Sequence, residues 1–259
     1  MTVRVQVLTL RLLLPLLLIF IHFPLCSSWC HYGRLTHTND VYEASYSPDS
    51  SKVVVASKDN NHYIYNPVSF QVEYPYVGST KSLSAKFSRD GLYIAIGLQN
   101  NSIVILSNSY AFVAAVPSAI GAIEELHFNK ESTLMLACGS VGSRGYEIFD
   151  VATWTVVYSD YTYGNTAMCC RFADNGNYAV GSQDGFVRYY SSAHSLIWSN
   201  QRNTNSPIEA LDFSPNSSYL LVSWSGAGKK VGIFAVGSNS SELNLTIGGS
   251  TSNFGVDWS

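Results

Sequence analysis

The stretch that decides the fold runs from Cys170 to Tyr190 and reads CRFADNGNYAVGSQDGFVRYY. An apolar run ends at Phe172, a turn follows in Ala-Asp-Asn-Gly, and a second apolar run continues to Ser182. A second turn, Gln-Asp-Gly, leads to a run that ends in two tyrosines. Asn, Asp and Gly are the residues that tight turns require, and short apolar runs between turns are typical of strands. The stretch therefore predicts three consecutive antiparallel strands joined by hairpins.

The same pattern occurs five times along the chain and begins a sixth time. One aromatic residue, which we call the anchor, marks each copy: Tyr46, Phe87, Phe128, Phe172, Phe213 and Trp258. The anchors are separated by 41, 41, 44, 41 and 45 residues, a period typical of one four-stranded blade of a β-propeller. Turn residues follow the five complete anchors at 47–50, 88–91, 129–132, 173–176 and 214–217. We therefore expect an all-β propeller of about five four-stranded blades plus a partial sixth.

Alternation along each strand predicts which side chains enter the core. Residues two positions before each anchor share its face of the sheet, and all are apolar: Ala44, Ala85, Leu126, Cys170, Leu211 and Val256. The second strand ends in a small residue, which would let neighbouring blades approach closely: Ala56, Gly97, Cys138, Ser182 and Ser223. A third strand is expected to end at Tyr65, Leu106, Phe149, Tyr190 and Phe234, and a fourth follows each.

These repeats resemble the WD-repeat (WD40-like) family of β-propellers over nearly all of residues 32–259. The best match is the fourth repeat, where residues 181–190 (GSQDGFVRYY) are similar to the small residue, Asp-Gly turn and third strand of the family. Residues 56–59 (ASKD) resemble the same motif in the first repeat. The Trp-Asp dipeptide of the family is absent, and Phe149-Asp150 is its nearest counterpart. The resemblance implies a non-catalytic scaffold that binds a protein or peptide.

The number of blades leaves two alternatives open. Residues 29–259 correspond to about five and a half repeats, because residues 253–259 (NFGVDWS) form only the first strand of another one. Either the chain is truncated, or it is a short propeller whose last blade is completed by both termini. In the second case residues 32–38 would supply an outermost strand, because propellers avoid unpaired edges.

The N-terminus has the pattern of a secretory signal. Arg4 and Arg11 precede an uncharged apolar run over residues 12–25, which is too short to cross a bilayer as a helix and contains Pro15. We expect residues 1–28 to form a hydrophobic leader helix, with cleavage after Ser28. The alternative is an uncleaved membrane anchor. Cleavage would leave residues 29–259 as the propeller, in the secretory pathway or outside the cell, with no membrane contact.

Composition excludes several classes of protein. The formal net charge is −3 and charged residues make up 13% of the chain, without the basic patch that nucleic-acid binding requires. Five cysteines without paired C-x-x-C spacing are too few for a disulfide scaffold or a structural zinc site. Cys138 and Cys170 occupy core positions of the repeat, and Cys169 points to the opposite face from Cys170. A bond between Cys30 and Cys169 remains an alternative.

Motifs of catalysis are weak or missing. The chain has no H-E-x-x-H helix and no G-x-S-x-G elbow, and the Gly-rich residues 226–230 (GAGKK) precede a strand rather than the helix that a phosphate loop needs. We therefore predict no catalytic, cofactor-binding or metal-ligating residues. The alternative is a secreted hydrolase or lactonase with an axial metal. It would draw its ligands from acids near the first strands: Asp40, Glu43, Glu124 and Glu209.

A propeller gathers two sets of loops on one face, those between second and third strands and those between blades. Loops on a rigid scaffold are where binding residues concentrate. The candidates for contact with a partner are Lys58, Asp59, Asn60, Gln99, Arg144, Tyr161, Tyr163, Gln183, Asp184, Lys229 and Lys230. Residues 158–163 (YSDYTY) are the densest tyrosine cluster, and tyrosines are enriched where binding energy concentrates. The alternative is that these tyrosines pack on the neighbouring blade.

Four N-x-S/T sequons fall in expected turns or edge strands, at Asn100, Asn216, Asn239 and Asn244. They would be glycosylated if the leader directs export. The sequence as a whole therefore predicts a secreted, glycosylated interaction scaffold.

Overall fold

The structure is a computed structural model that describes residues 39–78, 80–140, 145–202, 206–225, 229–238, 241–247 and 256–258. These residues form twenty β-strands and no helix. The strands pair into five antiparallel sheets of four strands each, which are the expected blades. The leader at residues 1–28 and the strand expected at 32–38 lie outside the described residues. Within the described part, no helix is long and apolar enough to span a membrane.

Each blade consists of four strands consecutive in sequence. The first blade contains β1 (Val41–Tyr46), β2 (Val53–Ser57), β3 (Asn61–Tyr65) and β4 (Val72–Val77); the second contains β5 (Ser82–Phe87), β6 (Tyr93–Leu98), β7 (Ser102–Ser107) and β8 (Phe112–Pro117). The third contains β9 (Ile123–Phe128), β10 (Leu134–Gly139), β11 (Gly145–Asp150) and β12 (Thr155–Asp160); the fourth contains β13 (Ala167–Phe172), β14 (Tyr178–Ser182), β15 (Phe186–Tyr190) and β16 (Leu196–Gln201). The fifth contains β17 (Ile208–Phe213), β18 (Tyr219–Trp224), β19 (Lys229–Ala235) and β20 (Ser241–Ile247).

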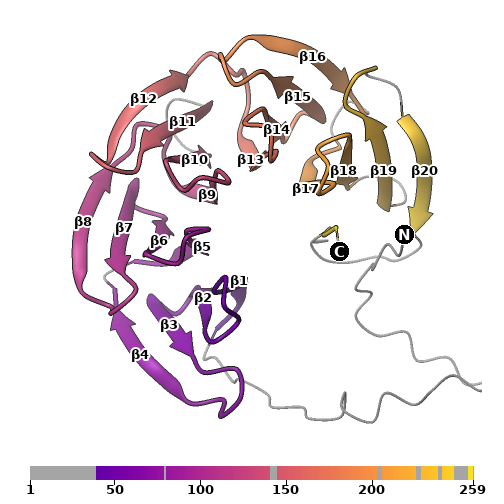
Figure 1. The fold of residues 1–259 in the computed structure, drawn as a ribbon. Helices are drawn as coiled ribbons and strands as arrows, with labels where there is room; N and C mark the ends of the chain where they lie inside the picture. The colour runs from indigo at the N-terminus through magenta and orange to yellow at the C-terminus, as the bar shows by residue number, and fades with distance from the viewer. Residues whose placement is uncertain are drawn as a thin grey trace, which may run out of the picture.

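The blades follow one another around a common axis (Figure 1). In each blade the first strand lies innermost and the fourth lies on the circumference, as Figure 1 shows for β5 to β8. The innermost strands β1, β5, β9, β13 and β17 lie side by side in sequence order. The propeller architecture expected from the repeat period is confirmed.

The hairpin turns after the anchors are built as the sequence predicts. In the first blade the hydroxyl of Ser47 donates to the carboxylate of Asp49 at 2.6 Å, and in the second Ser88 donates to Asp90 at 2.6 Å. The last turn residue has a positive φ in every blade, and Gly91 and Gly176 are the two glycines that supply it without strain. These bonds fix the angle at which each second strand leaves the inner strand.

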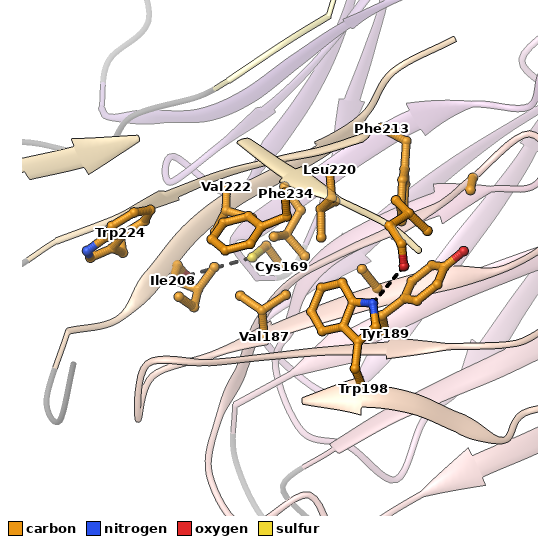
Figure 2. Packing of buried hydrophobic residues seen from close by; sticks show 14 residues of the cluster. Cys169, Val187, Tyr189, Trp198, Ile208, Phe213, Leu220, Val222, Trp224 and Phe234 are labelled. Atoms are coloured by element: carbon orange, nitrogen blue, oxygen red, sulfur yellow. Dashed lines mark hydrogen bonds between the residues drawn. The ribbon is translucent and has the colours of Figure 1, made fainter. Parts of the chain in front are cut away.

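Four hydrophobic clusters fill the interfaces between successive blades. Each combines one face of a blade with the facing side of the next, and the cluster between the fourth and fifth blades is shown in Figure 2. There the indole Nε1–H of Trp198 donates to the backbone carbonyl of Val236 at 2.9 Å, and Phe213 packs at 5.9 Å from the ring of Tyr189. Burying apolar area contributes roughly 25 cal/mol per Å², so these interfaces stabilise the packing of successive blades.

Four of the six anchors are buried in the interfaces between described blades, whereas Trp258 is half-buried and Tyr46 is exposed. Phe87, Phe128, Phe172 and Phe213 are at most 8% exposed, but Tyr46 is 63% exposed. Each buried anchor is covered by the blade that precedes it. No described blade precedes the first one, so the expectation that Tyr46 plugs an equivalent interface is wrong for the described residues.

Small residues lie where neighbouring blades approach each other closely. In the fourth blade this small residue stands one position before the predicted one. A Cβ added to Gly97 would lie 2.6 Å from Cγ2 of Ile123 in the next blade, which leaves no room for a side chain. Gly181 is equally confined, at 2.5 Å from Cγ2 of Ile208. The register pairs Gly97 with Ser84 and Gly181 with Cys169. The equivalent of Gly97 in the fourth blade is therefore Gly181, and Ser182, which the sequence pattern favoured, is the next residue.

Candidate functional site

Backbone hydrogen bonds join the two sets of loops on one face of the propeller, which we call the loop face. The carbonyls of Asn60, Asn101 and Gly185, in the turns between second and third strands, each accept a backbone N–H from the start of a loop between blades. The donors are Gly78 at 2.8 Å, Ser118 at 2.9 Å and Arg202 at 2.9 Å. Because the same bond recurs in three blades, the loops are fixed to the strands.

The turns of the loop face place polar side chains at their tips. Asn60 and Asn101 have φ of 66° and Gly185 has φ of 83°, in the left-handed region that Asn and Gly tolerate best. Asn60, Gln99 and Gln183 are exposed, as a binding role requires. The half-buried candidates are Lys58, Asp59, Asp184 and Lys230.

The half-buried acids stabilise the turns themselves. The carboxylate of Asp59 accepts the hydroxyl of Tyr63 at 2.9 Å and the backbone N–H of Asn61 at 3.0 Å. In the fourth blade Asp184 accepts the backbone N–H of Phe186 at 3.2 Å and the hydroxyl of Ser182. These contacts rigidify the turns, and the neighbouring Asn60 and Gln183 remain exposed.

Tyr161 is held at the loop face by a buried carboxylate that the sequence analysis missed. Its hydroxyl donates at 2.6 Å to Glu147, which is only 1% exposed, while Tyr161 as a whole is 40% exposed. Glu147 also accepts the hydroxyl of Ser118 at 2.5 Å and the backbone N–H of Ala119 at 3.1 Å. Burial and the bond to Glu147 raise the pKa of Tyr161 above its ordinary value. Glu147 thus clamps two loops between blades and orients the tyrosine.

Tyr163 lies in the core rather than on the surface. It is 3% exposed, its hydroxyl donates to the carbonyl of Val180 at 2.7 Å, and the guanidinium of Arg188 lies 4.1 Å from the centre of its ring. The ring also meets Tyr146 edge-on at 5.9 Å. For Tyr163 the structure therefore matches the packing alternative, so its side chain does not reach a partner in this conformation.

The remaining candidate residues fall into two groups. Arg144 and Asn239 lie outside the described residues, and the side chains of Lys229 and Asn244 are not described. Asn100 and Asn216 are exposed in turns. The hydroxyl of Ser102, the third residue of its sequon, donates to the side-chain oxygen of Asn100 at 2.7 Å.

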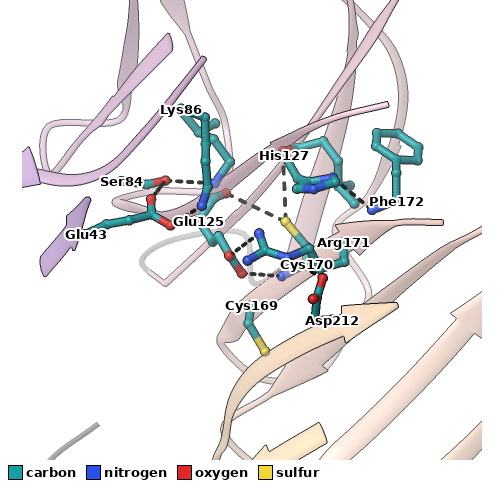
Figure 3. Close-up of polar contacts among 12 residues, drawn as sticks. Glu43, Ser84, Lys86, Glu125, His127, Cys169, Cys170, Arg171, Phe172 and Asp212 are labelled. Atoms are coloured by element: carbon teal, nitrogen blue, oxygen red, sulfur yellow. Dashed lines mark hydrogen bonds and ion pairs between the residues drawn. The ribbon is translucent and has the colours of Figure 1, made fainter. Parts of the chain in front are cut away.

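A row of alternating charges, which we call the axial row, lines the innermost strands (Figure 3). It runs from Glu43 on β1 through Lys86 on β5, Glu125 on β9 and Arg171 on β13 to Asp212 on β17. Arg171 donates to Glu125 at 2.6 Å, its Nε lies 3.6 Å from Asp212, and Lys86 is paired with Glu43. Each carboxylate is at most 19% exposed in its side chain. The axial row is a sequence of ion pairs between neighbouring blades.

Backbone amides complete the axial row. Glu43 accepts the N–H of Ala85 at 3.1 Å, and Glu125 accepts the N–H of Cys170 at 2.8 Å. His127 accepts the N–H of Phe172 at its Nδ1, at 3.1 Å, and burial holds the pKa of this imidazole well below its usual range. These contacts join inner strands of successive blades.

Glu43, one of the four acids that the hydrolase alternative would use as metal ligands, is already part of the axial row. Glu43 is neutralised by Lys86 and accepts the hydroxyl of Ser84 at 2.6 Å. Burial raises the pKa of Glu124, which favours a neutral carboxyl rather than a metal-binding carboxylate. Among the described residues no group of three or more His, Cys, Asp and Glu side chains could hold a metal ion. No observation supports the hydrolase.

The cysteines of the fourth blade face opposite sides, as expected. Cys169 contributes to the cluster shared with the fifth blade, and its Sγ lies 3.7 Å from the carbonyl of Ile208. Cys170 contributes to the cluster shared with the third blade, which also contains Cys138. All three are free, buried thiols, whose pKa values are raised by burial. Cys30, the other member of the alternative disulfide, is outside the described residues.

Five four-stranded blades around one axis, with ordered loops on one face, define the chain as a β-propeller. Two segments, residues 29–66 and 157–191, match the family model described as WD domain, G-beta repeat. Together with the repeated four-stranded sheets, these matches fit a WD-repeat β-propeller. A search of curated proteins found no match. WD-repeat proteins are generally scaffolds for protein interaction and are typically not enzymes.

Proposed function

We propose that this propeller is a non-catalytic scaffold that binds a protein or peptide on its loop face. The observation that carries the proposal is the clamp on Tyr161: the residue is 40% exposed, while its hydroxyl is held by Glu147. A pre-oriented tyrosine loses little conformational entropy on binding and offers a large contact area.

Polar groups beside this ring would supply specificity. Gln183 belongs to a turn joined to the same loop, because its backbone N–H donates to the carbonyl of Thr166 at 2.9 Å. Its exposed side-chain amide can donate and accept, which suits the backbone of a peptide. Gln99 offers the same chemistry in the second blade.

Comparative affinity purification tests this proposal. Wild type, Tyr161→Ser, and the double variant Gln99→Ala with Gln183→Ala would be expressed in the native cells, and co-purifying proteins quantified by mass spectrometry. Phe112→Ser is the matched control, because Phe112 is 62% exposed on the outer strand β8, away from the loop face. We expect both loop-face variants to lose a specific partner by about tenfold or more, as loss of a binding hot spot implies. If these variants retain the partner, or if the purified protein turns over a lactone or peptide, the proposal of a non-catalytic scaffold that binds on the loop face is refuted.

We propose further that residues 1–28 direct the chain into the secretory pathway. The proposal is supported by the charged start and short apolar run of the leader, and by the exposure of the sequon residues Asn100 and Asn216. Intact mass before and after glycosidase treatment should reveal an N-terminus at Trp29 and glycans lost in Asn100→Gln and Asn216→Gln. An N-terminus retained at residue 1 would instead favour the membrane anchor, and an unglycosylated chain in the cytosol would refute export.

A further inference from the structure

Arg202, at the end of the fourth blade, is a cation without a counter-ion among the described residues. Arg89 and Arg171 each pair with a carboxylate, but Arg202 forms no ion pair in the part of the chain that the structure describes. Burial lowers the pKa of Arg202, and no described acid opposes this effect. A guanidinium keeps its charge in a protein, so the positive charge of Arg202 is available to a ligand.

Arg202 lies at the loop face, between the fourth and fifth blades. It directly follows β16, and its backbone N–H donates at 2.9 Å to the carbonyl of Gly185. The side chain of the preceding residue, Gln201, donates through Nε2 to the carbonyl of Asp184 at 3.3 Å. Both acceptors belong to the turn that carries Gln183. Arg202 is therefore fixed beside a residue that the proposed function assigns to partner binding.

The guanidinium of Arg202 lies over two buried aromatic rings of the fifth blade. Its Cζ is 4.3 Å from the centre of the Phe234 ring and 5.8 Å from that of Trp224. These residues are 1% and 4% exposed and belong to the cluster between the fourth and fifth blades. Figure 2 shows Trp224 at one end of this cluster. Contact with the rings restricts the guanidinium, so Arg202 loses less conformational entropy when it binds a ligand.

Two N–H groups at this place have no acceptor. Nε of Arg202 and the indole Nε1 of Trp224 are buried, and neither forms a hydrogen bond. Arg202 as a whole is only half-buried, and its Nη1 and Nη2 remain open to solvent. A guanidinium can donate two parallel N–H bonds to a carboxylate, which is the strongest form of this contact. A fixed cation with unpartnered donors is therefore suited to bind an oxyanion.

We propose that Arg202 binds a carboxylate of the partner, so that the loop face recognises an acidic side chain between the fourth and fifth blades. This inference rests on the proposed function, because it names the chemistry of the partner at the same face. Lys230 is the cross-strand neighbour of Trp224, and such neighbours share a face of the sheet. Lys230 also has no ion pair among the described residues. A partner segment that carries Glu or Asp would therefore meet complementary charge.

Binding of a fluorescent hexaglutamate peptide, blocked at both ends, to the whole chain at low salt tests the proposal. Fluorescence anisotropy gives the dissociation constant for wild type and each variant. Arg202→Gln removes the charge, and we expect it to weaken binding by about tenfold or more. Arg202→Lys keeps the charge without the two-pronged donor, so it should weaken binding by a smaller factor. Arg89→Gln is the matched control, because Arg89 is 51% exposed in a turn at the opposite end of the strands from the loop face. It should bind as wild type does.

Several results would overturn the carboxylate site. These are a wild type that does not bind the peptide, unchanged binding in Arg202→Gln, and an equal loss in Arg89→Gln. Displacement of the peptide by inorganic phosphate as effectively as by unlabelled hexaglutamate, at equal ionic strength, would also overturn it, because the site would then bind any anion. If Arg202→Gln does not fold, Arg202→Lys decides the test, and binding equal to wild type would overturn the site.

Affinity purification with Tyr161→Ser distinguishes this inference from the proposed function. A partner lost from Tyr161→Ser but kept by Arg202→Gln would leave the scaffold intact and overturn the carboxylate site. Peptide binding that depends on Arg202, with no partner lost from Tyr161→Ser, would support the carboxylate site and refute the scaffold as proposed.

Discussion

Replacement of Arg171, the cation that pairs with two carboxylates of the axial row, should show how much the row contributes to stability. Arg171 serves two carboxylates, with Nη1 at 2.6 Å from Glu125 and Nε at 3.6 Å from Asp212. The side chains of Glu125 and Asp212 are 13% and 19% exposed, so water cannot replace the guanidinium. Breaking a buried ion pair by removing one partner costs about 3–5 kcal/mol. Arg171→Met approximately keeps the volume of the side chain. We expect its free energy of unfolding at pH 7.5 to be lower than that of wild type by an amount in that range.

The loss should diminish in acid. Without Arg171, burial raises the pKa values of Glu125 and Asp212 further above their ordinary values, so the folded variant binds more protons than its unfolded chain. Stability then falls as pH rises through the window between the unfolded and folded pKa values. Arg171→Met should therefore recover part of its deficit, relative to wild type, between pH 7.5 and pH 5.

Urea unfolding at the two pH values measures both effects, with two comparisons. Arg89→Met removes a 51% exposed arginine whose Nη2 lies 3.7 Å from Asp174, and should change stability by less than about 0.5 kcal/mol. The double variant Arg171→Met with Glu125→Gln should regain stability, because one uncompensated charge is gone. A deficit below about 1 kcal/mol, or one that does not change with pH, would refute the account of the row as buried ion pairs.

Three further outcomes are expected from equilibrium unfolding. Tyr163→Phe should lose about 1–2 kcal/mol, because the hydroxyl leaves a buried carbonyl of β14 without its 2.7 Å bond; an unchanged stability would contradict the core position of this side chain. Gly97→Val should lower the free energy of unfolding by about 1–3 kcal/mol, because the added side chain clashes with Ile123. Gly237→Val should be tolerated, because no atom lies within 4 Å of its added Cβ. Burial lowers the pKa of His62 to about 4, so the folded state binds fewer protons than the unfolded chain between about 6.5 and 4, and stability should fall as pH falls through that window. His62→Gln should flatten this part of the stability profile, and an unchanged slope would contradict a buried neutral imidazole.

The repeat period was enough to predict the blades, because each blade is a local unit of four strands that are consecutive in sequence and paired with their neighbours. The turns and four anchors are found where the repeat predicts them, and the five third-strand residues are buried as expected, although β7, β11 and β19 each end one residue later than predicted. The prediction was wrong for Tyr46, since burial of an anchor depends on the preceding blade and not on its own repeat. In the fourth blade the prediction was wrong by one residue, because Gly181 rather than Ser182 is the small residue packed against the next blade. Strand register determines which residue takes this position.

The candidate site was less predictable, because its contacts join residues far apart in the chain. Glu147 was missed although Tyr161 was found, since nothing in the sequence shows that a carboxylate on β11 accepts a hydrogen bond from the hydroxyl of Tyr161. A signal for the axial row was present: its residues stand one or three positions before the anchors, on the face opposite the core. Glu43 was instead a candidate metal ligand, because a carboxylate considered without the neighbouring blade does not reveal its partner Lys86.

The two faces of the innermost strands support the proposal that a partner binds on the loop face. One face carries the anchors and is sealed in the interfaces between blades. The other carries the axial row, in which each of Glu43 and Glu125 already has a cation and a backbone amide. A ligand inserted along the axis would have to replace buried ion pairs, and leaving one of those charges unpaired costs about 3–5 kcal/mol. A partner that contacts the exposed tips of the loop face would not have to break these ion pairs, which is why we propose that it binds there.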